Sequence, residues 1–298
     1  MKLPVALAPG VWRLGTYNIA VFLIGGSDAA ALFEVGVSGT SSLVLSQIDA
    51  LGISRESVRW VVVSHAHADH ATGQGTLMAG LDNASLVLTP TSAKFMAKPS
   101  TAGEWAAEDA FTNQALAQAG DVNPAAPQAA LNLLPEPLHL LEPGDHLDLG
   151  DLTLDFMSAD GHVPGGLTVH IPQRRAVLSS DSGGFVSQEP PGFPLYFVSY
   201  PTYLDTMQSL ADLKPEILAL GHQDYFMGKA VGQYLAMVEG DLAREHQHIL
   251  AEAQRGCTVQ AIAQQIFDHY YKNELLIYSP ASIMECCELL VRRSLEEG

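Results

Sequence analysis

Short apolar segments, separated by glycine and polar residues, dominate the first part of the chain. Residues 10–15, 18–25 and 29–37 are rich in Val, Leu and Phe, with Gly, Ser and Asp between them. Runs of this kind, punctuated by turn residues, indicate β-strands. Residues 58–65 are almost entirely apolar, so we expect a central strand there that is covered on both faces.

The apolar spacing changes between residues 38 and 52. Leu43, Val44, Ile48 and Leu51 recur at helical intervals, with Ser and Thr before them and Gly52 after them. This arrangement is typical of a capped amphipathic helix. A second helix is predicted over residues 202–213. Further strand patterns lie at residues 84–90, 138–159, 167–182 and 215–222.

Two segments depart from this alternation. Residues 98–137 join a helical stretch to a connector rich in Pro and Ala, which is typical either of a lid or of a surface excursion without a role. Residues 229–298 show helical spacing throughout. We therefore predict an α/β (α+β) main domain over 1–228, with 98–137 as an insertion, followed by a helical extension over 229–298.

The composition limits the classes of function. The chain has 298 residues, of which 47% are hydrophobic, and a formal net charge of −18. This charge argues against binding to nucleic acid or to an anionic membrane surface. The first ten residues do not resemble a secretory signal, and three cysteines, two of them adjacent, suit no disulfide framework. We expect a cytoplasmic protein that acts on a small molecule.

Four potential metal ligands lie at and directly after the end of the predicted strand at residues 58–65. His65, His67, Asp69 and His70 lie within six residues. Residues two apart in an extended segment point the same way, so His65 and His67 can hold one ion together. Asp69 and His70 lie further round the turn and can face a second ion. Imidazole and carboxylate groups together are the ligands of zinc and iron sites.

Three later positions offer more nitrogen and oxygen ligands. His162, Asp181 and His222 each follow an apolar strand pattern. Alone, each would be read as a turn residue or a cap, but together they complete a ligand set at equivalent strand ends. The remaining histidines lack this context, and we expect them on the surface or in the core: His139, His146, His170, His246, His248 and His269.

The order "HAHADH", "GHVPG", "SSDSG" and "LGH" resembles the metallo-β-lactamase superfamily and, within it, the glyoxalase II-type hydrolases. The resemblance covers about residues 10–228 and implies an αββα sandwich with a two-metal site at the edge of the paired sheets. Residues 1–228 would then be the catalytic domain. The resemblance assigns His65, His67 and His162 to one metal, Asp69, His70 and His222 to the other, and Asp181 to a bridge between them.

Some positions depart from the patterns of this superfamily. Asp160 stands where members often have Pro, and Ser180 stands where they often have Gly, but neither change removes a ligand. Class B β-lactamases usually carry Cys at the position of Asp181, and flavodiiron proteins usually carry Glu at the position of His67. Hydrolysis of β-lactams and flavodiiron redox chemistry are therefore disfavoured.

The resemblance implies a hydrolytic mechanism. Two divalent ions that share a water lower its pKa from about 15.7 toward about 7, and the resulting metal-bridging hydroxide attacks an ester, thioester or lactone. Asp69 and Asp181 would orient this water and carry its proton to the leaving group. Ligands of this type suit zinc, iron or manganese, and we expect zinc first.

The substrate is less well defined by the sequence. Tyr200, Tyr203 and Tyr225 follow the predicted ligand motifs, and we consider Tyr200 and Tyr225 as hydrogen-bond donors to the oxyanion, or as aromatics that only pack in the core. The extension has few Lys or Arg residues and many apolar ones, which favours a largely apolar substrate or a homodimer contact. The extension also resembles that of the quinolone-signal response thioesterase group, whose C-terminal helices partly cover the metals.

Two other functions remain open at this point. A mononuclear iron persulfide dioxygenase shares the HxHxDH pattern but binds metal through two His and one Asp. A regulatory protein on a hydrolase scaffold would act through the helical tail. Metal stoichiometry distinguishes the first of these from the hydrolase, and the cellular effect of a His67→Ala variant distinguishes the second.

Overall fold

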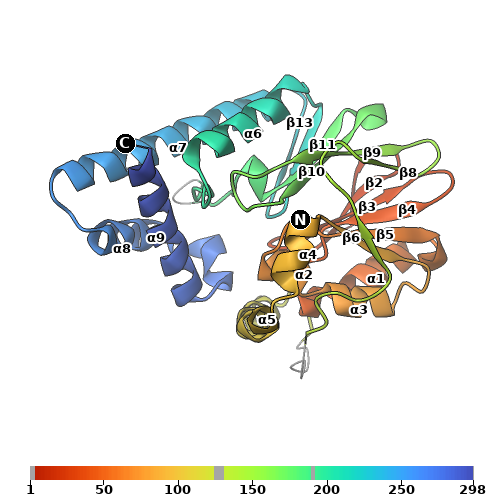
Figure 1. The fold of residues 1–298 in the computed structure, drawn as a ribbon. Coiled ribbons are helices and arrows are strands. Elements are labelled where there is room, and N and C mark those ends of the chain that lie inside the picture. Colours follow the sequence, from red (N-terminus) through yellow and green to blue (C-terminus); the bar gives the residue numbers. More distant parts are fainter. Residues whose placement is uncertain (1–3, 124–130, 189–191, 298) are drawn as a thin grey trace.

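The computed structural model describes residues 4–123, 131–188 and 192–297. Two mixed β-sheets stack face to face at its centre (Figure 1). The first sheet has the strand order β1-β2-β3-β4-β5-β6-β7 and the second β13-β12-β11-β10-β9-β8. The strands of the first sheet are β1 (Val5–Ala8), β2 (Val11–Gly15), β3 (Ala20–Gly25), β4 (Ala30–Phe33), β5 (Val58–Val62), β6 (Ser85–Leu88) and β7 (Leu138–Leu140). Those of the second are β8 (His146–Asp148), β9 (Thr153–Ser158), β10 (Leu167–Ile171), β11 (Ala176–Ser180), β12 (Ile217–Leu220) and β13 (Tyr225–Met227).

Alternating residues of β3 explain why its sequence is apolar throughout. Phe22 and Ile24 belong to the core between the two sheets, whereas Val21 and Leu23 belong to the core beneath the helices. Successive side chains of a strand point to opposite faces, so a strand that is covered on both faces must be apolar at every position. In β5 the same reasoning holds for Val61 and Val62, which belong to the two different cores, whereas Arg59 near its start is exposed.

Helices cover both outer faces of the sandwich (Figure 1). Side chains of α1 and α3 pack on the first sheet, and side chains of α6 and α7 pack on the second. This arrangement confirms the predicted αββα fold. The helices are α1 (Ser41–Ala50), α2 (Ala68–Ala71), α3 (Gln74–Ala79), α4 (Pro90–Met96), α5 (Pro99–Ala119), α6 (Tyr200–Asp212), α7 (Lys229–Gln254), α8 (Val259–Tyr270) and α9 (Pro280–Glu296), with short 3₁₀ turns that include η1 (Ser38–Thr40), η4 (Asp181–Gly183) and η5 (Asn273–Ile277).

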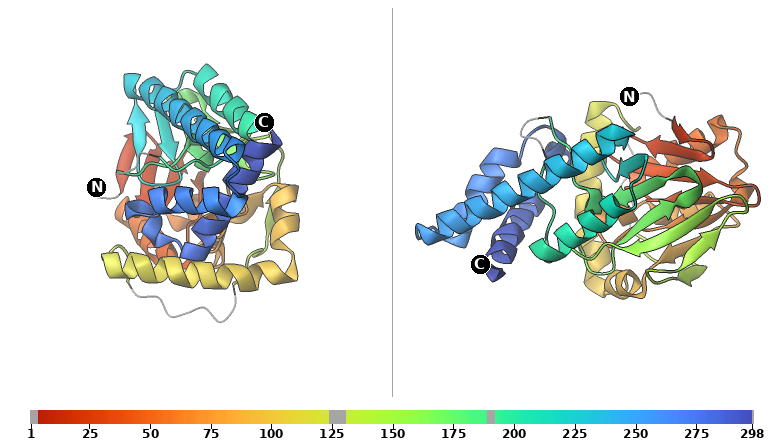
Figure 2. Two further views of the ribbon diagram at one scale, coloured as in Figure 1. Left: turned by 90° about the vertical axis from the view of Figure 1, so that its left-hand side faces the viewer. Right: turned by 90° about the horizontal axis from the view of Figure 1, so that it is seen from above.

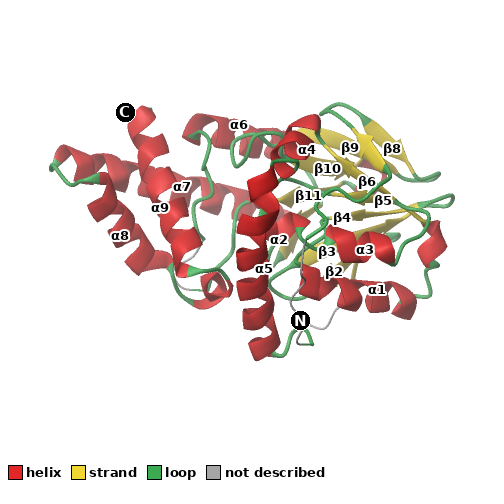
Figure 3. Ribbon diagram, turned by 60° about the horizontal axis from the view of Figure 1, so that its bottom comes forward, coloured by secondary structure: helices red, strands yellow, loops and turns green. Residues whose placement is uncertain are grey.

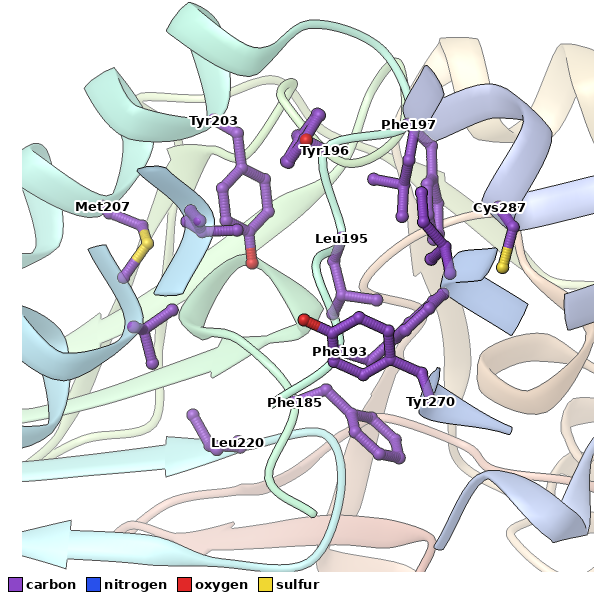
Figure 4. Packing of buried hydrophobic residues seen from close by; sticks show 14 of the residues in the cluster. Phe185, Phe193, Leu195, Tyr196, Phe197, Tyr203, Met207, Leu220, Tyr270 and Cys287 are labelled. Atoms are coloured by element: carbon purple, nitrogen blue, oxygen red, sulfur yellow. The ribbon is translucent and has the colours of Figure 1, made fainter. Parts of the chain in front are cut away.

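The C-terminal helices extend from one end of the sandwich (Figure 2). They share a hydrophobic cluster with the second sheet, in which Leu218 and Leu220 of β12 and Tyr203 of α6 lie with Tyr270 of α8 and Cys287 of α9. Figure 4 shows part of this cluster from close by. The extension is therefore packed onto the sandwich through a common core.

The insertion contributes one long helix. Helix α5 runs between the sandwich and the C-terminal helices (Figure 3), and residues 124–130 of the predicted 98–137 insertion lie outside the described residues. Pro99 at its first position and Gly120 in the left-handed region after its last residue match ordinary helix-end preferences. Within the part of the chain that the structure describes, no helix is both long and apolar enough to cross a membrane.

Candidate metal centre

The seven predicted ligand residues meet at one edge of the sandwich. β5 precedes His65 and His67, while β9, β11 and β12 precede His162, Asp181 and His222. β11 and β12 are parallel, and β9 has the same direction because both β9 and β11 run antiparallel to β10. Their carboxyl ends therefore lie together, and polar groups that follow them converge.

The first group contains four potential ligands. The atoms offered by His65, His67, His162 and Asp181 lie within 4.8 Å of one another. His67 Nδ1 lies 3.1 Å from His65 Nε2 and 3.1 Å from His162 Nε2. Asp181 Oδ2 is 3.3 Å from His162 Nε2 and 3.9 Å from His65 Nε2.

The second group lies on the other side of Asp181. It contains Asp69, His70 and His222, whose ligand atoms also lie within 4.8 Å of one another. Asp181 Oδ1 is 3.3 Å from His70 Nε2 and 3.2 Å from His222 Nε2. The two oxygens of one carboxylate thus face the two groups separately.

In four of these histidines, the ring nitrogen that faces away from the cluster has a hydrogen-bond partner in the protein. Nδ1 of His162 lies 2.7 Å from the carbonyl oxygen of Leu195, and Nδ1 of His222 lies 2.7 Å from that of Asn18. A carbonyl can only accept, so each Nδ1 carries the proton and each Nε2 presents its lone pair to the cluster.

Glu34 orients one histidine of each group, and the sequence analysis did not predict this residue. Glu34 follows β4 and is fully buried. Its Oε2 accepts from His70 Nδ1 at 2.9 Å and from Ser64 Oγ at 2.9 Å, and Ser64 Oγ lies 2.9 Å from His65 Nδ1. The available signal was a single acidic residue within the apolar run at 29–37, directly after a strand that pairs parallel with β5.

The surroundings shift the pKa values of the cluster. Burial lowers the pKa of His65 well below its usual value, and burial with the neighbouring His162 lowers that of His67 to about 3. Burial also opposes protonation of His70 and His222, but the carboxylates beside them outweigh it and raise both pKa values. Burial would raise the pKa of Asp181, yet His70 and His222 hold it well below the usual range.

These residues fit a pair of divalent cations. Inward-facing imidazole nitrogens lie only 3.0–3.1 Å apart, as for His70 Nε2 and His222 Nε2 at 3.0 Å. When these rings are neutral and their outward nitrogens carry the protons, the inward lone pairs face each other, and a cation between them relieves the repulsion. Five imidazoles and two carboxylates supply nitrogen and oxygen ligands of the kind that zinc, iron and manganese accept.

The backbone around Asp181 and His222 is tightly constrained. Ser180 has φ 51° and ψ −142°, a region that favours glycine. Here the Ser180 hydroxyl lies 3.1 Å from Ser64 Oγ. A Cβ at Gly221 would lie 2.9 Å from the ring of His70 and 3.0 Å from Asp181 Oδ1, so only glycine fits there.

A cavity of about 690 Å³ opens above the cluster. His67, Asp69, His162, Asp181 and His222 line its floor. Its walls come from α5, from the loop before α6, and from η5 and α9 of the extension. The insertion and the extension therefore both shape access to the metal-binding residues.

Tyr278 of the extension reaches the cluster, and sequence reasoning missed this residue too. Its hydroxyl donates to Asp69 Oδ2 at 3.0 Å and lies 3.4 Å from His222 Nε2. Burial of the hydroxyl, together with Asp69, raises the pKa of Tyr278 well above its usual value, so the group stays protonated. Little in the sequence signals this contact, because Tyr278 and Asp69 are 209 positions apart in the chain.

The structure places Tyr200 and Tyr225 away from the cavity, which corrects the expectation for both. Tyr200 begins α6, and its ring stacks on His246 of α7 at 4.1 Å between centroids. After His222 the chain turns back to form β13 against β12, so Tyr225 packs against the core between the sheets. Tyr203 is buried and donates to the backbone oxygen of Asp181 at 2.7 Å.

In comparisons with known proteins, the chain matches a family model and several solved structures of the metallo-beta-lactamase type. The family model described as the metallo-beta-lactamase superfamily matches residues 14–222. A metallo-beta-lactamase family protein from Thermus thermophilus is similar at 17% identity and a TM-score of 0.64, with 93% of each chain covered. A metallo-beta-lactamase from Cronobacter sakazakii is similar at 21% identity and a TM-score of 0.57, covering 87% of this chain and 100% of that one. The inverting sec-alkylsulfatase Pisa1 from Pseudomonas sp. is similar at 15% identity and a TM-score of 0.63, covering 97% of this chain and 49% of that one.

Proposed function

The chain belongs to the metallo-β-lactamase superfamily, and on this premise we propose that it is a dinuclear metal-dependent hydrolase of an ester, thioester or lactone. One observation carries the proposal: seven His and Asp side chains from four strand ends form two adjoining groups that share Asp181. His65, His67 and His162 would hold one ion and Asp69, His70 and His222 the other. Zinc is the first expectation for both sites, with iron or manganese as alternatives.

Two divalent ions held by these residues would supply Lewis acidity and would lower the pKa of a bound water. The protein residues supply the orientation. Glu34 fixes His65, through Ser64, and His70, while the carbonyls of Leu195 and Asn18 fix His162 and His222. Each of these four rings therefore already presents one nitrogen to the cluster, so metal binding would require no rotation of the rings.

Asp69 is the residue best placed for proton transfer. It lines the cavity floor, and Tyr278 donates to its Oδ2. We assign Asp69 the role of accepting the proton of the attacking water and delivering it to the leaving group. Tyr278 is then a positioning residue that holds the Asp69 carboxylate in one orientation.

The chemistry of the cavity supports carbonyl substrates. Asp181 stands in the shared position instead of Cys, and aromatic side chains such as Phe185, Phe193 and Phe197 line the cavity. Apolar walls around a few convergent polar groups are typical of sites for small, largely apolar substrates. We include thioesters among the candidate substrates because the ligand motifs resemble those of the glyoxalase II-type hydrolases and the helical extension resembles that of the quinolone-signal response thioesterase group.

Hydrolysis of generic esters, thioesters, lactones and phosphodiesters by the purified protein tests the proposal. We expect turnover of at least one carbonyl class, loss of that activity with a chelator, and recovery on addition of zinc, iron(II) or manganese. His65→Ala should abolish hydrolysis and lower the metal content, because it removes a ligand from the first group.

The matched control is His146→Ala, because His146 is an exposed strand residue outside the cluster. This variant should keep full activity and metal content. Full turnover and metal content in His65→Ala would contradict the proposal. A single iron per chain with oxygen uptake would indicate the persulfide dioxygenase instead.

A further inference from the structure

The walls of the cavity are strongly apolar. Phe193, Leu195 and Phe197 line it from the segment before α6, and Trp105 lines it from α5. All four side chains are buried, and Phe193, Leu195 and Phe197 belong to the hydrophobic cluster drawn in Figure 4. A ligand in this cavity would therefore place apolar groups against them.

The charged residues of the cavity walls are all acidic. Glu104, Glu108 and Asp109 come from α5, and Glu285 comes from α9 on the other side of the cavity. Among the described residues that line the cavity, none is Lys or Arg. The positive charge that the proposed metal ions would bring lies at the floor, so the upper walls contribute only negative charge.

Two of these carboxylates are free to face a ligand. The Asp109 oxygens are buried and accept from Ser38, Thr72 and Asn113, and one oxygen of Glu108 accepts from Ser279. Glu104 and Glu285 are exposed and yet line the cavity, so they lie at its rim.

We propose that this cavity selects uncharged or positively charged substrates with an apolar body and excludes anionic ones, an inference that rests on the proposed hydrolase function. An anionic group at the end of the substrate away from the scissile bond would meet Glu104 and Glu285. It would find no guanidinium or ammonium group on the described walls to replace its hydration. A cationic or neutral group at the same position has no such penalty, and a cationic one is attracted.

A matched series of esters tests this selectivity. The esters share one acyl chain and one leaving group and carry trimethylammonium, methoxy or sulfonate at the far end of the acyl chain. We expect kcat/KM for the trimethylammonium ester to exceed that for the sulfonate ester by about tenfold or more at low salt. The ratio should shrink as ionic strength rises, because salt screens charges at an exposed rim.

The double variant Glu104→Gln/Glu285→Gln tests the residues. It should reduce the cation-to-anion ratio by about threefold or more, since it removes both rim charges while keeping the side-chain size. Glu239→Gln is the matched control, because Glu239 is an exposed glutamate on α7 outside this cavity. The control should keep the wild-type ratio.

Binding of non-hydrolysable amphiphiles separates this inference from the proposed function. Octyltrimethylammonium, octanol and octanesulfonate differ only in the head group, and quenching of Trp105 in the cavity reports their binding, with a Trp105→Phe variant as the background. The first two should bind about tenfold or more tightly than octanesulfonate. If no ester is hydrolysed, the proposed function fails and this series alone decides the charge preference. Equal or tighter binding of octanesulfonate to chelator-treated protein, in which no metal ion can bind the sulfonate, would overturn the inference.

Discussion

Single side chains in this protein connect parts of the cluster that the sequence keeps apart. Glu34 is the clearest case, because one carboxylate oxygen orients a histidine of the second group directly and a histidine of the first group through Ser64. Burying a carboxylate is costly, and here, among the described residues, only Oε2 has hydrogen-bond partners, which are His70 and Ser64. The presence of Glu34 at a strand end is therefore explained by the ligands that it orients.

Tyr278 is expected to matter for turnover more than for metal binding. Tyr278→Phe removes the donor to Asp69 Oδ2 but keeps the ring. We predict a loss of roughly 10–100-fold in kcat, the usual cost of losing a partner that orients a metal ligand. Steady-state kinetics together with metal analysis of the variant would check this.

Tyr225→Phe and Tyr200→Phe are the controls for that experiment, because neither side chain lines the cavity. Both should keep wild-type kinetics. A Tyr278→Phe enzyme with unchanged kcat, or a large loss of kcat in either control, would show that Tyr278 does not position Asp69.

The seven potential ligands could be predicted at this scale because each lies near the end of an apolar strand in a short motif. Glu34 and Tyr278 could not be predicted in the same way. Glu34 is an isolated acidic residue, and Tyr278 reaches the site only through packing of distant helices. Tyr200 and Tyr225 were expected near the site because they follow ligand motifs in sequence, but a helix start and a strand reversal turn them elsewhere.

At the scale of elements, the buried carboxylate of Asp109 connects α5 to the sandwich through hydrogen bonds. Asp109 accepts from the backbone N–H and the hydroxyl of Ser38, from Thr72 and from Asn113. Thr72 lies directly after α2, which carries Asp69 and His70. The insertion is thus tied to the segment that supplies two of the three ligands of the second group.

Asp109→Ala should loosen this connection. The change leaves several buried donors without an acceptor, and we predict a loss of about 2–4 kcal/mol in the free energy of unfolding. Urea denaturation would measure it. Glu104→Ala on the same helix is the control, because that side chain is exposed, and it should change stability by less than about 0.5 kcal/mol. Equal effects of the two variants would contradict the role given to Asp109.

At the scale of the whole molecule, the extension and the sandwich share one core. Tyr234, Leu242 and Ile262 of the extension lie in the same hydrophobic cluster as Val177 and Leu220 of the second sheet. The extension also contributes Tyr278 to the metal-binding cluster and Glu285 to the cavity rim. A boundary near residue 228 in the sequence is therefore not a boundary in the packing.

Removal of residues 229–298 should unfold the protein. The cut exposes many apolar side chains, each worth about 1.5–3 kcal/mol when buried, against a total stability of about 5–15 kcal/mol. We predict aggregation or loss of cooperative thermal unfolding. Removal of residues 297–298 alone is the control and should leave the melting temperature unchanged. A soluble, cooperatively folded fragment 1–228 would show that the shared core is dispensable.

The mixture of strands and helices was predictable from the patterns over the first 228 residues, whereas the αββα sandwich was implied by the resemblance of the ligand motifs to a known superfamily. The short elements were not predictable. β13 has only three residues and α2 only four, and such segments carry too few positions for a period to be recognised. The placement of the helical extension over the cavity depends on contacts between residues far apart in the chain, which local patterns do not encode.

Metal analysis of the purified protein tests the central claim most directly. Inductively coupled plasma mass spectrometry of the wild-type chain, after incubation with zinc, iron(II) or manganese and removal of excess metal, should give two ions per chain. Asp181→Ala, which removes the carboxylate shared by both groups, should retain at most one ion and no hydrolytic activity. A folded wild-type protein that retains no metal, or an Asp181→Ala variant with two ions and full turnover, would contradict the account.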